Sequence, residues 1–160
     1  MIPSSPTKKR FLGQYPGIID DKNRLSVPAE YRRILPEHEK TLILTPGGDG
    51  FLNAFPLDLF NTVSDNLDSS ALGFATDDSL AVDTTLIGEA AEREIDGQGR
   101  IILPPNLLKH LGDERTVLMM GRTNHFVIWS KPAYEKYRAG LQLTSGEAWK
   151  KALDQTKKEP

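Results

Sequence analysis

The stretches "DDKNRLSVP" (residues 20–28) and "DGQGRIILP" (residues 96–104) share one pattern: aspartate, three residues, arginine, three residues, proline. The second stretch begins 76 positions after the first, and other identities keep the same offset. These are the pairs Ile19 and Ile95, Leu35 and Leu111, Leu42 and Leu118, and Pro56 and Pro132. A constant offset over about forty residues indicates two copies of one supersecondary unit.

Each copy predicts the same order of local structure. An apolar lead-in meets a polar turn, "DDKN" or "DGQG", whose Asp, Asn and Gly residues suit a tight reversal. The runs "RLSV" and "RIIL" then precede a proline, which favours extended backbone. The second run is apolar on both faces, so we expect it to be the more deeply buried strand. Short helices are expected from Pro28 and Pro104 onward, because proline is tolerated in a first helical turn.

The rest of each copy is predicted to be a hairpin followed by a helix. Strands are predicted at residues 41–45 and 51–55 in the first copy and at 116–120 and 126–129 in the second. Helices are predicted after Pro56, after Ser130 as an N-cap, from Leu86 into Glu92, and after Thr144, which forms a capping box with Glu147. The glycine-rich "PGGDG" from Pro46 reads as a hairpin turn and not as a phosphate-binding loop.

Length and composition fit one compact domain. The chain has 160 residues, of which 38% are hydrophobic and 26% are charged, the balance of a globular protein. We expect an α+β fold, mostly β, in which the two repeats share a core under a pseudo-twofold axis. The expected parts are a flexible basic N-terminus (1–10), a first repeat with its helix (11–67), an acidic connector (68–92), a second repeat (93–137) and a C-terminal helical tail (138–160).

Charge is divided unevenly along the chain. Residues 41–92 contain nine Asp and Glu and no Lys or Arg, whereas the rest of the chain holds all 20 basic residues. Such asymmetry favours a basic face that steers a polyanion, although a solvated connector between two ordinary modules would produce the same pattern. The chain has no cysteine, no apolar run long enough for a membrane span and no secretory signal, so we expect a cytoplasmic protein without a membrane partner.

The doubled motif resembles the AbrB-type swapped-hairpin family, and in particular its bacterial transcriptional regulators that carry both copies in one chain. The carrying residues are "DDKNRLSVPAEYR" and "DGQGRIILPPNLL", with "FLGQY" and "FVIWS" in support, and the match spans about Phe11 to Tyr137. Asn23 departs from the family, which usually has glycine there, and the tail beyond Tyr137 matches no motif of it.

The resemblance implies a barrel of split β-α-β pieces, a ring-like homo-oligomer and binding to short guanine-containing direct repeats upstream of division and cell-wall genes. Double-stranded DNA and further copies of the chain are then the partners, and the protein is nucleoid-associated. The candidate DNA-binding residues are Arg24, Arg100, Lys22, Asn23 and Gln98, with Asp20 and Asp96 positioning the arginines and Lys8, Lys9 and Arg10 as candidate phosphate contacts.

The residue types suit that task. The planar guanidinium of arginine donates two hydrogen bonds to O6 and N7 of guanine in the major groove. An aspartate four positions earlier, across a tight turn, would fix the aim of that side chain. The competing hypothesis is that each Asp–Arg pair only closes the fold.

Two other classes of function are the alternatives to DNA binding. An enzyme would need a metal or acid–base site, and the residues that would have to form it are Asp77, Asp78 and Asp83. The three histidines, His38, His110 and His125, show no ligand spacing. We therefore expect no enzyme, no metal, no cofactor and no small-molecule substrate. The other alternative is an antitoxin-like interaction module without its own operator. Its feature would be the amphipathic tail 147–158, whose stripe of Ala148, Trp149, Ala152 and Leu153 we expect to pack on its own domain.

Overall fold

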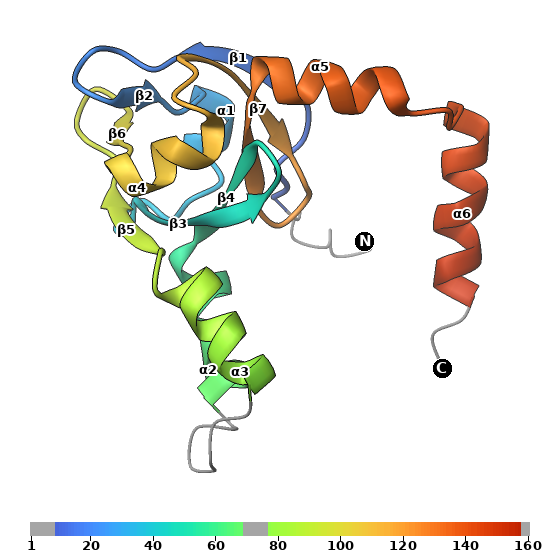
Figure 1. The fold of residues 1–160 in the computed structure, drawn as a ribbon, viewed down its shortest axis with the longest axis horizontal. Coiled ribbons are helices and arrows are strands. Elements are labelled where there is room, and N and C mark those ends of the chain that lie inside the picture. Colours follow the sequence, from blue (N-terminus) through green and yellow to red (C-terminus); the bar gives the residue numbers. More distant parts are fainter. Residues whose placement is uncertain (1–8, 69–76, 158–160) are drawn as a thin grey trace, which may run out of the picture.

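The computed structural model describes residues 9–68 and 77–157 (Figure 1). Most of the strands lie in one antiparallel sheet of six, in the order β1-β7-β8-β4-β3-β5, and β2 pairs with β6 in a separate two-stranded ribbon. The strands are β1 (Gln14–Ile18), β2 (Arg24–Ser26), β3 (Thr41–Gly48), β4 (Phe51–Pro56), β5 (Ala91–Glu94), β6 (Arg100–Ile102), β7 (Thr116–Gly121) and β8 (Phe126–Ser130). The α+β class and its predominance of sheet are as predicted.

The helices connect or flank these strands. They are α1 (Ala29–Arg32), α2 (Leu57–Asp68), α3 (Asp77–Val82), the π-helical η1 (Asp83–Ile87), α4 (Pro105–Leu108), the 3-10 helix η2 (Lys109–Leu111), α5 (Lys131–Gly140) and α6 (Ser145–Lys157). The predicted helix from Leu86 into Glu92 is wrong. The helical turns end at Ile87, and from Ala91 the chain is β5, because its backbone pairs with β3.

The two repeats exchange strands. β1 of the first repeat pairs with β7 of the second, and β5 of the second pairs with β3 of the first. The repeats therefore share one sheet, in which the backbone N–H of Ile19 donates to Arg115 and that of Ile95 donates to Lys40 at equivalent positions. The arms of each Asp-x-x-x-Arg turn pair with the other repeat and not with each other.

The expected barrel is not closed. β1 and β5 are the edges of the six-stranded sheet, and among the described residues no ladder joins β1 to β2 or β5 to β6. The physical reason lies in the turns: the N–H of Asp20 donates to the carbonyl of Arg24, and the chain then diverges toward different partners. The β2–β6 ribbon packs against the sheet through its side chains.

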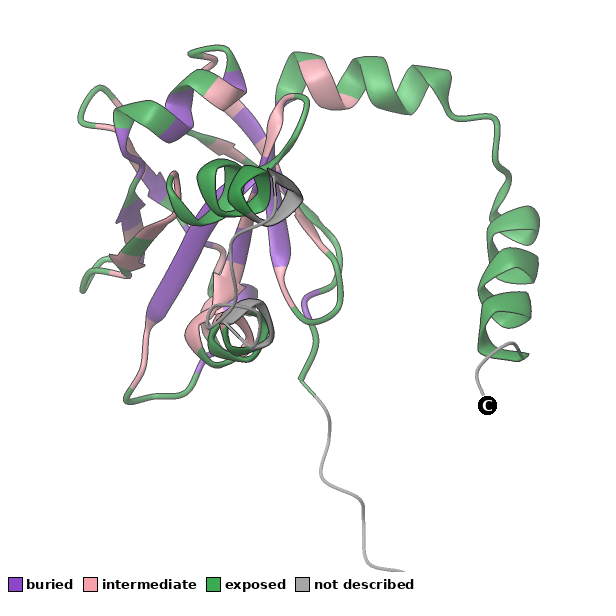
Figure 2. Ribbon diagram, turned by 60° about the horizontal axis from the view of Figure 1, so that its bottom comes forward, coloured by how far each residue is buried: buried purple, intermediate pink, exposed green. Residues whose placement is uncertain are grey.

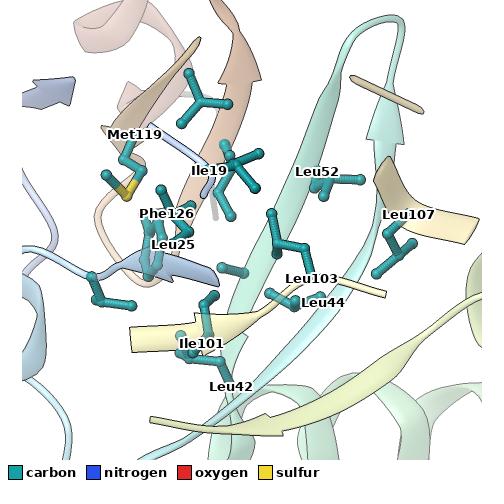
Figure 3. Packing of buried hydrophobic residues seen from close by; sticks show 14 of the residues in the cluster. Ile19, Leu25, Leu42, Leu44, Leu52, Ile101, Leu103, Leu107, Met119 and Phe126 are labelled. Carbon is teal, nitrogen blue, oxygen red and sulfur yellow. The ribbon is translucent and has the colours of Figure 1, made fainter. Parts of the chain in front are cut away.

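The ribbon contributes one inward residue from each strand to the core. Leu25 and Ile101 face each other across the register and are almost fully buried beside Met119, Phe126 and Leu42 (Figure 3). Apolar side chains of this size each stabilise a fold by about 1.5–3 kcal/mol when fully buried. β2 and β6 have the same burial pattern, so the expectation that the second run is the more buried strand is wrong.

The C-terminal helices leave the body of the protein (Figure 1). Ser130 caps α5 by accepting the N–H of Ala133, and Thr144 and Glu147 form the reciprocal capping box predicted at the start of α6. Every described residue of α6 is exposed (Figure 2), and Trp149 is 70% exposed. The expectation that its stripe packs on its own domain is wrong, because extended backbone at Leu141 directs α6 away from the sheet.

Candidate nucleic-acid interface

In the first loop, one aspartate holds the whole turn. Asp20 Oδ1 accepts the backbone N–H groups of Lys22 and Arg24 at 2.9 and 2.8 Å, and Oδ2 accepts Nε–H of Arg24 at 2.7 Å. Asn23 closes the reversal at φ 64°, in the left-handed region that asparagine tolerates better than most residues. The turn thereby fixes both the backbone of Arg24 and the first nitrogen of its guanidinium.

The second loop repeats this geometry. Asp96 Oδ1 accepts the N–H groups of Gln98 and Arg100 at 2.8 and 3.0 Å, and Oδ2 accepts Nε–H of Arg100 at 3.2 Å. Gly99 stands at φ 80°, in the place that Asn23 holds in the first loop. Duplication has therefore preserved an arrangement of atoms as well as a sequence pattern.

Hydrogen bonding keeps both aspartates ionised. The backbone N–H of Arg24 lowers the pKa of Asp20, against a smaller opposing effect of desolvation, and the side chain of Arg24 lowers it further. The backbone N–H of Arg100 lowers the pKa of Asp96 in the same way. Both Asp–Arg ion pairs are therefore kept to a lower pH than an ordinary aspartate would allow.

The ribbon puts both arginines on one face. Arg24 lies opposite Ile102 and Arg100 lies opposite Ser26, while Leu25 and Ile101 point to the core from between them. Arg24 and Arg100 are thus diagonal neighbours, whose Cα atoms are typically about 7–8 Å apart. A two-stranded antiparallel ribbon is narrow enough to enter the major groove of B-DNA.

Neither arginine is in the interior. The side chain of Arg24 is 28% exposed and that of Arg100 is 27% exposed. Both side chains donate to their aspartates through Nε, and within the described part of the chain the two terminal nitrogens of each guanidinium have no hydrogen-bond partner. The end of each fork that would contact a guanine is therefore available.

Three further arginines near the loops were missed by sequence reasoning. Arg115 of the second repeat donates from Nη1 to the carbonyl of Asp20 at 3.0 Å and to Oδ1 of Asn23 at 2.7 Å. Arg32 of the first repeat lies against Gly99 of the second, and Arg93 donates to the carbonyl of Ile102 at 3.0 Å. Strand exchange brings Arg115 to the loop of the first repeat and Arg32 to the loop of the second. No local spacing in the sequence indicates these contacts.

The remaining candidates differ in their placement. Lys22 and Gln98 are exposed at equivalent places in the two loops. Asn23 stabilises its loop, because its side-chain Oδ1 accepts a hydrogen bond from Arg115. Lys9, in the N-terminal segment, reaches the C-terminal end of α1, where its Nζ donates to the carbonyl of Arg33 at 3.4 Å. Lys8 is outside the described residues.

Features that would suggest other chemistry lie elsewhere. His110 pairs with Glu89 at 3.0 Å, and His125 packs on Phe55 with ring centroids 4.8 Å apart. Burial and the nearby Arg122 lower the pKa of His125. Residues 9–68 and 77–157 contain no group of three or more His, Asp or Glu that could hold a metal ion, and the side chains of Asp77 and Asp78 are outside what the structure describes.

Over the same two described ranges, no helix is long and apolar enough to cross a bilayer.

Fold and loops together define a class: a two-repeat α+β protein that presents one Asp-anchored arginine from each repeat on a shared β-ribbon. Residues 86–157 match the family described as "MraZ protein, putative antitoxin-like". Relatives named "Transcriptional regulator MraZ" match over most of the chain. That of Oenococcus oeni is 36% identical over 130 residues, covering 81% of this chain and 87% of the relative. That of Heliobacterium modesticaldum is 33% identical over 144 residues, covering 90% and 97%.

The chain therefore belongs to the MraZ family, and the resemblance predicted from the doubled motif is confirmed. The family match also corrects one expectation. It continues past Tyr137 to residue 157, so the C-terminal tail is part of the family pattern.

Proposed function

We propose that this protein is a non-enzymatic, sequence-specific DNA-binding transcriptional regulator that reads short guanine-containing direct repeats with its β2–β6 ribbon. Arg24 and Arg100 donate to guanines, and Asp20 and Asp96 hold their aim. Lys22 contacts phosphate and Gln98 reaches a base edge. The repeats lie upstream of division and cell-wall genes, which makes the protein nucleoid-associated.

One observation carries this proposal: two guanidinium groups, each anchored at Nε by an aspartate, share the outer face of one ribbon and keep their terminal nitrogens available. An ion pair that only closed a turn would not require the second end of the fork to stay unpaired. A bidentate arginine–guanine contact discriminates between bases by about 1–3 kcal/mol. The name of the relatives, transcriptional regulator, supports the same reading.

The acidic part of the chain favours one orientation on DNA. α2 and α3 contain no basic residue, and α2 carries the exposed carboxylates of Asp58 and Asp65. In Figure 1 these helices project below the sheet, whereas β2 and β6 lie at its upper left. The ribbon can therefore approach phosphates without bringing these carboxylates close to them.

Affinity requires more than one protomer. Non-specific protein–DNA binding at physiological salt has a Kd of about 10⁻⁴–10⁻⁶ M, and one ribbon adds only two base-reading arginines. In a ring-like homo-oligomer, consecutive ribbons engage consecutive repeats, and each later contact becomes intramolecular. Avidity then rises by about 10²–10⁴.

The α6 helix favours a second candidate, an antitoxin-like interaction module without an operator. Trp149 and Leu153 are 70% and 56% exposed, as the anchor residues of a partner-binding helix would be. Such a module has no need of the anchored arginines. DNA binding separates the two candidates.

The test is binding of the full chain to DNA amplified from upstream of its own gene, at moderate salt, against a scrambled duplex. Arg24→Ala and Arg100→Ala should each lose about tenfold or more in affinity and relax base preference, because each removes a bidentate contact. Lys22→Ala should weaken all sequences alike and lower the salt slope by about one.

Arg122→Ala is the matched control, since it removes the same charge from an exposed position at the β7–β8 turn. Its affinity should stay close to that of the wild type. Unchanged affinity and salt slope in a folded Arg24→Ala variant would remove the base contact and leave the ion pair a purely structural role.

A further inference from the structure

The two ends of the ribbon are not equivalent. Across the register, the partner of Arg24 is Ile102, whereas the partner of Arg100 is Ser26. Ile102 and Ser26 hold corresponding positions of the two repeats, so the pseudo-twofold symmetry of the ribbon is broken next to the arginines. One end joins a guanidinium to an apolar side chain, and the other end joins it to a hydroxyl.

The register also fixes how close these side chains are. Leu103 donates to the carbonyl of Asn23 and Val27 donates to that of Gly99, so these flanking pairs are hydrogen-bonded. Pairs alternate along an antiparallel ladder, which makes Arg24–Ile102 and Ser26–Arg100 non-hydrogen-bonded pairs. In such pairs the side chains approach most closely, with Cβ atoms about 4.5–5.5 Å apart.

Ile102 is exposed in a place where folding does not require isoleucine. It is 54% exposed, while its neighbour Ile101 is fully buried. Its carbonyl is held by Arg93, which fixes the backbone and leaves the side chain pointing outward with Arg24. An exposed apolar side chain beside a base-reading arginine has an obvious chemical counterpart in the major groove, the C5-methyl group of thymine.

We infer that Ile102 is a specificity-determining residue that contacts the 5-methyl group of a thymine in a base pair next to the guanine read by Arg24. At the Arg100 end, Ser26 occupies the corresponding position, and no thymine methyl group is required there. The inference rests on the proposed DNA contact of the ribbon. It adds a direction to the recognised repeat, because the two arginines then read unequal neighbours.

The test removes the methyl groups and leaves base pairing intact. The DNA upstream of the protein's own gene is amplified once with thymidine triphosphate and once with deoxyuridine triphosphate, and the affinity of the full chain for both is measured. Wild type should lose about fourfold on the uracil DNA for each repeat contacted, the value of one buried methyl group. Ile102→Ser should bind both DNAs equally, at about the affinity of wild type for the uracil form.

Leu12→Ser is the matched control, because Leu12 is 63% exposed but lies outside the ribbon. It should keep the full preference for thymine. Equal binding of both DNAs by wild type, or an undiminished thymine preference in Ile102→Ser, would overturn the inference. So would a fall in the particle mass of Ile102→Ser by light scattering, since Ile102 would then be a contact between subunits.

The outcomes also separate this inference from the function on which it rests. Specific binding that depends on Arg24 but not on thymine methyl groups refutes the role of Ile102 alone. Absence of binding to either DNA above a scrambled duplex refutes the DNA-binding function, and the role of Ile102 with it.

Discussion

At Gly99 the second loop needs a residue without a side chain. Its φ is +80°, and a Cβ there would lie 2.8 Å from Cζ of Arg32. A left-handed conformation costs a residue with a side chain about 1–2 kcal/mol. We therefore expect Gly99→Ala to lower the free energy of unfolding by about that amount, measured by urea denaturation.

Gly97, two residues earlier in the same loop, is the control for that substitution. A Cβ at Gly97 meets no atom of the described chain within 4 Å. Gly97→Ala should leave stability unchanged or raise it by about 0.4–1 kcal/mol, because alanine restricts the unfolded chain. Equal destabilisation by both substitutions would contradict the argument from backbone conformation.

Tyr31 links the core to the start of β1 and gives stability a pH dependence. Its hydroxyl donates to the carbonyl of Gly13 at 2.9 Å, and burial raises its pKa to about 12. A raised pKa means that the folded state favours the neutral phenol. This contribution is complete below the unfolded pKa of about 10 and is lost as the pH rises through about 12.

We expect Tyr31→Phe to be less stable than wild type at neutral pH by about 0.5–1.5 kcal/mol, because the fold loses the hydrogen bond from the Tyr31 hydroxyl while the carbonyl of Gly13 still accepts the N–H of Gly121. The difference should shrink between pH 10 and pH 12, since phenylalanine does not ionise. Urea denaturation across this range measures it. Tyr137→Phe, at a half-exposed position on α5, should follow the wild-type curve, and a constant difference for Tyr31→Phe would contradict the titration argument.

The α6 helix of the single chain depends on its own termini, because no other element among the described residues covers it. Thr144→Ala removes the acceptor for the N–H of Glu147 and should cost the helix about 0.5–2 kcal/mol. Isolated helices of this length are marginal in water, so the loss should appear as reduced helicity in far-UV circular dichroism. Ser145→Ala is the control.

The same substitution reports on cooperativity. Since α6 lies apart from the sheet, Thr144→Ala should leave the midpoint of global unfolding in place (Figure 2). A midpoint shifted by the full cost of the cap would mean that α6 unfolds together with the body.

Local chemistry made most elements predictable. The Asp turns, the capping box at Thr144 and the N-cap at Ser130 each depend on residues within four positions, and each lies where the pattern predicted it. The helix expected from Leu86 failed because pairing of Ala91–Glu94 with β3 is a tertiary contact. For the same reason, the sequence could not reveal that Ile102 faces outward.

In the whole molecule, the candidate site is a product of strand exchange. The doubled motif predicted which residues carry the two loops, but only the pairing of β2 with β6 places them on one face. Arg115 and Arg32 reach the loops from the opposite repeats, so neither repeat alone contains a complete loop environment. Long-range pairing of this kind leaves no periodic signal in a single sequence.

The exposed stripe of α6 is the surface most suited to hold a ring together. We expect the double variant Trp149→Ser, Leu153→Ser to lower the particle mass measured by light scattering, because both side chains are more than half exposed in the single chain. Its affinity for DNA with several repeats should fall by about 10²–10⁴ as avidity is lost. Affinity for a single repeat should not change, since the ribbon is intact. Gln155→Ser, on the other side of α6, is the control, and an unaltered mass in the double variant would place the assembly contact elsewhere.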